Sequence, residues 1–326
     1  MERIFDFAPA VAADAAAVTE VVAALESSLY GESAYSQADL EDEWSSLDLE
    51  QNLRVVRDGD RIVGYGALHP RGELWRAEGF VHPDVQGRGI GTLIATRLEE
   101  EAGRRGARRI QNSVFEPDSA ARTLLELLGY RAVRTSREMR IELTAPPPPP
   151  AWPAGLRVVP FEPERDAFEF HAAHQEAFAD HWEYTPRDFG SWSKGNLGSE
   201  RFDPTLWCVV RDGEEIVAGT INTADTYGGG WIGVLFTRRP WRRQGVGAAL
   251  LHDAFGRFWA RGERSIGLGV DAESETGAFR LYERAGMVPA LGWITYEKAL
   301  PEVAADPSAR ARDIRTAAPD PVPFRL

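Results

Sequence analysis

Two glycine-containing hexapeptides decide the fold: Gln86-Gly87-Arg88-Gly89-Ile90-Gly91 in the first half of the chain and Arg242-Arg243-Gln244-Gly245-Val246-Gly247 in the second. Each follows a predicted strand and precedes a predicted helix. Glycines let a backbone approach a ligand closely, and the unpaired N–H groups of a first helical turn, reinforced by the helix dipole, hold phosphate oxygens. Each hexapeptide therefore predicts a pyrophosphate-binding loop, with an ordinary tight turn as the alternative.

Better-known phosphate loops are excluded by the surroundings. Neither hexapeptide has the Gly-Lys-Ser/Thr ending of a nucleoside triphosphatase loop. Neither follows the first strand of a βαβ unit, where a dinucleotide-binding fingerprint belongs, because both come after four predicted strands.

The sequence around one loop repeats around the other. The spacing from a turn glycine to the glycine of the loop is 30 residues in the first half and 32 in the second. The spacing from that loop glycine to a later, helix-ending glycine is 40 residues in the first half and 41 in the second. Near-equal intervals indicate one fold present twice. These glycines are Gly59, Gly89 and Gly129, and Gly213, Gly245 and Gly286.

Hydrophobic periodicity predicts the same order of elements in each half. Predicted strands span 4–7, 52–56, 61–69, 74–82 and 109–114, then 156–159, 206–211, 215–223, 231–237 and 265–271. Helices are expected at 14–29 and 38–46, at 165–179 and 186–194, and after each glycine loop, followed by another helix and a closing strand. This order predicts an α/β fold, a sheet with helices on both faces.

A run of five prolines, Pro146 to Pro150, continues into Ala151-Trp152-Pro153. Proline cannot donate backbone hydrogen bonds, so residues 146–153 are predicted to be a polyproline II linker, with a proline-rich recognition motif as the alternative. The linker divides the chain into predicted domains 1–145 and 154–300. Residues 301–326 have no periodicity and are predicted to be a flexible or surface-docked tail.

Composition restricts the classes of function. The chain is 43% hydrophobic and 27% charged, has no apolar stretch of membrane-spanning length and does not begin like a signal peptide, so a cytoplasmic protein without membrane contact is expected. The net charge of −13 argues against binding nucleic acid and favours cationic partners such as amines. Cys208, the single cysteine, lies in a predicted buried strand. Oligomeric state is not indicated.

Both hexapeptides fit the signature Gln/Arg-x-x-Gly-x-Gly/Ala, and the chain thereby resembles the GNAT acetyltransferases. Segments 118–125 and 274–282, ending at Gly129-Tyr130 and Gly286-Met287, are similar to that family's Asn-x-x-Ala-x-x-Leu-Tyr helix and following Gly-Phe. The resemblance covers nearly all the chain except linker and tail. It implies two tandem GNAT-like domains, each a mixed, mostly antiparallel twisted sheet flanked by helices, a plan similar to tandem acetyltransferases of the mycothiol synthase type.

The resemblance implies acetyl-CoA as co-substrate. In the second half it would be held by Leu235, Phe236 and Thr237 and by the loop Arg242, Arg243, Gln244, Gly245, Val246, Gly247 and Ala248. In the first half the equivalents are Phe80, Val81, Gln86, Gly87, Arg88, Gly89, Ile90, Gly91 and Thr92. Tyr282 lies where the family places a tyrosine that protonates or hydrogen-bonds the leaving thiolate, with a core aromatic as the alternative. The first half has Leu125 there.

The general base is left open. Glu78 of the first half lies where the family often has a carboxylate base, but Val234 is its counterpart in the second half. Asp271 and Asp225 are therefore the candidates there, each with a surface or turn role as the alternative. His181 with Trp182 is a weaker candidate for binding substrate. His171 and His174 share a helix face without a third ligand, so no metal site is predicted.

The expected function is transfer of an acetyl group from CoA to the primary amine of a small molecule through a ternary complex. The second half is expected to be catalytic and the first to have a structural or CoA-retaining role. Alternatives are a mycothiol-synthase-like activity on a cysteinyl-glucosaminyl-inositol and a non-catalytic acyl-CoA sensor or scaffold.

Overall fold

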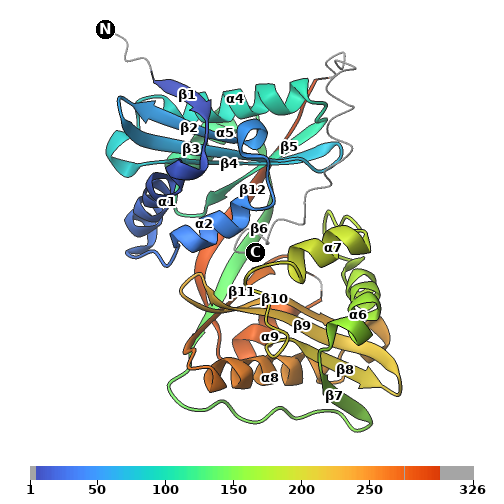
Figure 1. The fold of residues 1–326 in the computed structure, drawn as a ribbon. Coiled ribbons are helices and arrows are strands. Elements are labelled where there is room, and N and C mark those ends of the chain that lie inside the picture. Colours follow the sequence, from blue (N-terminus) through green and yellow to red (C-terminus); the bar gives the residue numbers. More distant parts are fainter. Residues whose placement is uncertain (1–4, 275, 302–326) are drawn as a thin grey trace. The chain divides into compact units, whose positions relative to one another are not determined.

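The computed structural model describes residues 5–274 and 276–301. The first half contains strands β1 (Asp6–Pro9), β2 (Leu53–Asp58), β3 (Arg61–His69), β4 (Leu74–Val81), β5 (Arg109–Phe115) and β6 (Arg131–Glu142). Its helices are α1 (Ala15–Tyr30), α2 (Gln37–Trp44), α3 (Leu49–Asn52), α4 (Ile90–Arg104) and α5 (Ser119–Leu127). The α/β fold predicted from the sequence is confirmed (Figure 1).

The second half repeats this order. Its strands are β7 (Leu156–Pro160), β8 (Cys208–Asp212), β9 (Glu215–Thr226), β10 (Gly229–Thr237), β11 (Ser265–Asp271) and β12 (Val288–Ala299). Its helices are α6 (Pro163–Phe178), α7 (Phe189–Asn196), α8 (Val246–Ala260) and α9 (Ala278–Arg284). Short 3-10 turns, Pro83–Val85 and Arg239–Trp241, lead into the two glycine loops.

Each sheet is mixed and mostly antiparallel, as predicted. The strand order is β1-β2-β3-β4-β5-β12 in the part built on the first half and β7-β8-β9-β10-β11-β6 in the part built on the second. The parallel pairs are β4 with β5 and β10 with β11, and each is a crossover connection made by the long helix that follows the glycine loop.

The closing strands are exchanged between the halves. Strand β6, from the first half, pairs with β11 from Ser136 opposite Asp271 to Glu142 opposite Ser265. Strand β12, from the second half, pairs with β5 from Trp293 opposite Phe115 to Ala299 opposite Arg109. Among the described residues, the two compact units are consequently residues 5–135 with 291–301, and residues 136–290.

These units differ from the domains 1–145 and 154–300 expected from the sequence. The proline-rich residues 146–153 have no regular secondary structure and connect β6 to β7, two strands of the same sheet. The boundary between the two units therefore falls inside β6, because residues of that strand from Ser136 onward belong to the second unit. Of the predicted tail, 302–326 lies outside the described residues.

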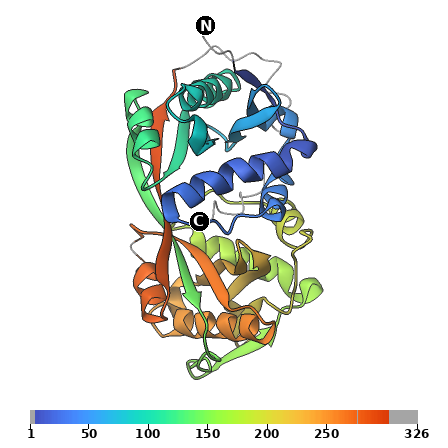
Figure 2. The same cartoon turned by 90° about the vertical axis from the view of Figure 1, so that its left-hand side faces the viewer.

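In the first unit, two hydrophobic layers cover opposite faces of the sheet. Val63 of β3 packs with Ile94 and the rest of the apolar stripe of α4, whereas its neighbours Ile62 and Tyr65 pack with α1 and α2. Successive side chains of a strand point to opposite faces, and the register shift between β2 and β3 at Val63 interrupts this alternation, so that Ile62 and Tyr65 share a face. Figure 2 shows α1 lying along the sheet.

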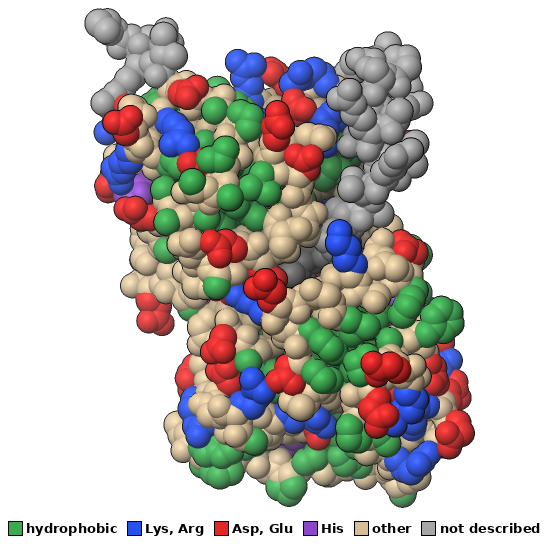
Figure 3. All heavy atoms as spheres, viewed as in Figure 1, with side chains coloured by type: hydrophobic (Ala, Val, Ile, Leu, Met, Phe, Trp, Pro, Cys, Tyr) green, Lys and Arg blue, Asp and Glu red, His purple; other side chains and the backbone are tan. Residues whose placement is uncertain are grey.

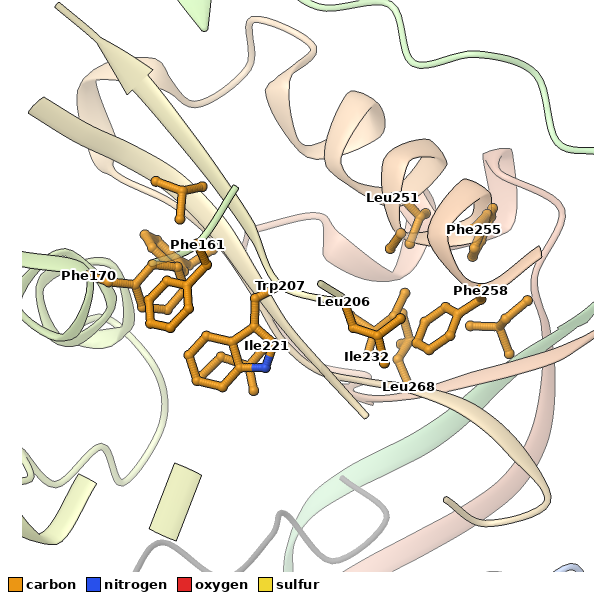
Figure 4. Packing of buried hydrophobic residues seen from close by; sticks show 14 of the residues in the cluster. Phe161, Phe170, Leu206, Trp207, Ile221, Ile232, Leu251, Phe255, Phe258 and Leu268 are labelled. Carbon is orange, nitrogen blue, oxygen red and sulfur yellow. The ribbon is translucent and has the colours of Figure 1, made fainter. Parts of the chain in front are cut away.

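The second unit has the same layering with a more aromatic core. Phe161, Phe170 of α6 and Trp207 pack together, with ring centroids 4.6 to 5.6 Å apart. On the other side Ile232 lies near Leu251 and Phe258 of α8 (Figure 4). The sheet therefore lies between α6 and α8. Packing against both helices fixes the end of β10 at which the glycine loop begins.

Acidic and basic side chains are interspersed on the face shown in Figure 3, without a patch of one sign. Within the described residues, no helix has both the length and the apolar composition needed to cross a bilayer.

Candidate active site

Two neighbouring strands of the second unit separate part of the way along. Strands β10 and β11 pair only from Gly230 opposite Ile266 to Ile232 opposite Leu268. Beyond that row β10 continues to Thr237, still paired with β9 on its other side, and no register pair joins it to β11. One edge of β10 therefore has backbone N–H and C=O groups that β11 does not use, and these groups suit an extended amide-containing ligand.

A β-bulge lies at the start of this separation. The register between β10 and β9 shifts between Ile232 and Val234, which makes Gly233 the extra residue. Bulges are frequent beside active sites because they redirect backbone groups and side chains. In the first unit β4 pairs with β3 without a shift from Arg76 to Val81, although β4 also separates from β5 after Ala77.

The glycine loop ends at the first turn of α8. Gly245 caps the helix with φ 89°, and the first helical hydrogen bond joins the Ala249 N–H to the Gly245 carbonyl at 3.1 Å. The N–H groups of Val246, Gly247 and Ala248 thus have no acceptor in the helix and can bind an anion. The first unit repeats this at Gly89, whose carbonyl accepts from Leu93 at 2.9 Å and leaves Ile90, Gly91 and Thr92 in the same state.

The arginines of the second loop have different roles. Arg243 has φ 61°, a left-handed conformation that Gly87 adopts in the first loop with φ 75°. A side chain is unfavourable in this conformation, and the guanidinium of Arg243 is exposed beside the loop, where it can contact an anion. Arg242 instead holds the loop in place: its guanidinium donates to the carbonyls of Thr237 at 3.0 Å and Ala177 at 2.7 Å, and its backbone N–H to Arg239.

Tyr282 lies on α9, 7% exposed. Burial raises the pKa of its phenol to about 12. Within the described residues its hydroxyl has no hydrogen-bond partner, so the proton is available to a ligand. Leu125, its counterpart on α5, is equally buried and has no such group.

The fold separates the two aspartates predicted as bases. Asp271 is the last residue of β11, on the part of that strand that has left β10. Burial lowers the pKa of His181, and the negative charge of Asp271 partly opposes that lowering. Asp225 is exposed near the end of β9, with φ 49°, and lies close to the start of β10, the end of that strand remote from the glycine loop. The fold brings Asp271, and not Asp225, to the separated end of the strands.

Glu78 and His171 have hydrogen-bond partners, whereas His174 packs against aromatic rings and its buried Nδ1 has no hydrogen-bond partner among the described residues. Glu78 lies 2.6 Å from His69 Nε2. His171 Nε2 is 2.8 Å from the carbonyl of Arg187. His174 is buried between Phe178 and Phe236, and burial lowers its pKa to about 3, so it stays neutral.

Sequence reasoning missed Gly233 and the conformation of Arg243. An isolated glycine inside a strand pattern is a signal for a bulge and could have identified the first. The second has no sequence signal apart from its alignment with Gly87.

Comparisons with known proteins define the family. The acetyltransferase (GNAT) family matches residues 19–130 and 166–287, one match in each half, and the chain belongs to that family. Its members use acetyl-CoA, and the chain is an N-acetyltransferase with the tandem organisation expected from its sequence.

Particular relatives are similar over most of the chain. Mycothiol acetyltransferases of Streptomyces scabiei and Thermobispora bispora are each 33% identical, over 73% and 71% of this chain and 75% and 78% of theirs. A GCN5-related N-acetyltransferase from Sphaerobacter thermophilus is 34% identical with a TM-score of 0.82, covering 92% of this chain and 97% of that one. A tandem GNAT protein of the clavulanic acid pathway, 16% identical with a TM-score of 0.72, shares the fold.

Proposed function

We propose that the second unit transfers an acetyl group from acetyl-CoA to the primary amine of a small molecule, in a ternary complex without a covalent enzyme intermediate. One observation supports this unit above the other. Among the described residues, it alone combines separated strands, a bulge at the point where they separate, and a tyrosine on α9 whose hydroxyl has no hydrogen-bond partner.

Acetyl-CoA would bind along two surfaces that meet at the loop. Its pyrophosphate would accept hydrogen bonds from the N–H groups of Val246, Gly247 and Ala248, with Arg243 adding a positive charge. The pantetheine amides would pair with the free edge of β10 between Leu235 and Thr237, as an added strand would.

In the reaction the amine nitrogen forms a bond to the thioester carbonyl carbon, and the carbon–sulfur bond breaks. Tyr282 would give its proton to the leaving sulfur, since a phenol with a pKa of about 12 is fully protonated at neutral pH. The acceptor must lose a proton before attack, and Asp271 is the candidate base from the predicted set. Positioning of amine against thioester supplies much of the rate.

For the first unit we propose a structural or CoA-retaining role. Its loop offers the same free N–H groups at Ile90, Gly91 and Thr92, but it lacks the bulge and has Leu125 in place of a tyrosine. Glu78 is paired with His69 instead of being open to an amine.

A second candidate acceptor is the cysteinyl-glucosaminyl-inositol of mycothiol synthesis. The relatives named mycothiol acetyltransferase, 33% identical over about three quarters of the chain, favour it. It too offers a primary amine, so the chemistry at Tyr282 is unchanged.

The test is release of CoA thiol from acetyl-CoA, followed with a thiol reagent, with a panel of primary amines and with cysteinyl-glucosaminyl-inositol. Amine-dependent release supports the proposal, and the better acceptor decides between the candidates. Acetyl-CoA binding without release for any acceptor would leave the sensor alternative.

A further inference from the structure

Strand β6 brings a buried carboxylate into the second unit. Glu138 is 1% exposed, and Arg140 donates to its Oε1 from Nε at 2.9 Å and from Nη2 at 2.5 Å. Its other oxygen, Oε2, is buried and has no hydrogen-bond partner in the part of the chain that the structure describes. An unpaired buried carboxylate oxygen is unfavourable, so its presence calls for a partner other than the described residues.

Arg140 is fixed by groups other than Glu138. Its Nη1 donates to Ser265 Oγ at 3.1 Å and its Nη2 to the carbonyl of Tyr227 at 2.9 Å. The arginine therefore cannot turn to satisfy both oxygens of Glu138. An ion pair with a purely structural role would be expected to satisfy both.

The register places Glu138 where the strands part. It lies opposite Gly269, the first residue of β11 beyond the last pair with β10. Gly269 has no side chain to occupy the space beside Glu138. In the preceding row Trp231, Gly267 and Arg140 are aligned across three strands, so Glu138 lies on the same face of the sheet as Trp231.

A second unpaired polar atom lies on this face. The indole Nε1 of Trp231 is buried and has no partner among the described residues. The six-membered part of the ring covers Gly267, whereas Cδ1, the atom bonded to Nε1, is 3.8 Å from where a Cβ of Gly233 would be. The free N–H is thus on the side of the bulge, and the face presents a carboxylate acceptor and an indole donor around the separating strands.

We propose that Glu138 is the acceptor-binding carboxylate of this site: Oε2 receives the ammonium group of the amine, and the indole N–H of Trp231 donates to an oxygen of the same molecule. This rests on the proposed function and specifies its acceptor as a cationic amine with a nearby oxygen. It also accounts for Val234, because the carboxylate that β10 lacks is supplied by β6.

The experiment measures amine binding apart from turnover. The full chain saturated with CoA is titrated calorimetrically with ethanolamine, glucosamine, tyramine and spermidine, and compared with Glu138→Gln and Glu142→Gln. The control makes the same change at an exposed position four residues along the same strand. Losing one charged hydrogen bond should weaken amine binding about 10- to 100-fold in Glu138→Gln. Affinity for acetyl-CoA should stay unchanged in both variants.

Equal amine affinity, or equal KM for an acetylated amine, in the two variants would overturn the inference without affecting the proposed function. Wild-type protein that binds none of the four amines would overturn it as well. Amine binding lost in Glu138→Gln but without acetyl transfer in the wild type would support the binding site and contradict the proposed function.

Discussion

Replacing Tyr282 with phenylalanine should separate activity from stability. The hydroxyl has no partner in the described chain, and burial raises its pKa from 10.0 to about 12. A hydrogen bond to a developing thiolate is worth about 1.5–3 kcal/mol, so kcat should fall about 10- to 100-fold. Removing a hydroxyl that makes no hydrogen bond within the described chain should leave the free energy of unfolding unchanged or raise it by up to about 1 kcal/mol.

The assay is steady-state thiol release alongside urea unfolding. Tyr296→Phe makes the same chemical change at a hydroxyl that donates to Glu126 at 3.1 Å, and it should cost about 1 kcal/mol of stability with kcat unchanged. A Tyr282→Phe enzyme within about threefold of wild-type kcat would refute the general-acid role.

The raised pKa also fixes a pH dependence. The folded state favours the neutral phenol, so this contribution to stability is complete below pH 10 and is lost as pH rises toward about 12. Two units correspond to about 3 kcal/mol. Unfolding measured from pH 8 to 11 should show a steeper alkaline loss in the wild type than in Tyr282→Phe.

Three further outcomes follow from the loop and the core. Gly245→Trp places a bulky side chain at a positive φ beside the free N–H groups of α8, so it should abolish productive acetyl-CoA binding in calorimetry. Gly89→Trp should leave activity intact. The opposite pair of results would make the first unit the working site. Arg243→Ala and Arg243→Gly should weaken acetyl-CoA binding alike, by about 5- to 10-fold and less at high salt, although glycine removes the strain. Asp166→Asn should cost about 3–5 kcal/mol in urea unfolding, because this fully buried carboxylate pairs with two arginines. Burial acts to raise the pKa of Asp166, but hydrogen bonds from those arginines hold it below the usual value, so its contribution is present at neutral pH and lost as acid is added.

The sequence was sufficient for the elements and their order. Strands β3 and β11 have the bounds predicted from alternation, and the ends of α1 are displaced by one residue. These elements are local: their periodicity, their Asp-Gly turns and their glycine caps lie within each segment. The loops, too, were recognisable because glycines at fixed spacing specify the helix start.

The exchange of β6 and β12 could not be predicted. Both strands follow a helix ending in glycine, and a duplicated chain offers each of them two equivalent edges, β5 and β11. Nothing in strand periodicity distinguishes the edge of one copy from that of the other. Glu138 lies within the predicted first domain, 1–145, and so outside a search for a base within 154–300, which left Asp271 at the separated strands.

The exchanged strands also bear on what holds the chain together. A protease cut among the exposed prolines of 146–153 would sever the backbone between β6 and β7. The N-terminal fragment would still supply β6 to the second unit, and the C-terminal fragment would still supply β12 to the first. The fragments should remain interlocked under native conditions and separate only when a sheet is melted. For the same reason a gene fragment encoding either half alone would yield a sheet with an open edge, prone to pair with a second copy. Each half therefore needs the other for its last strand, and expression requires the whole chain.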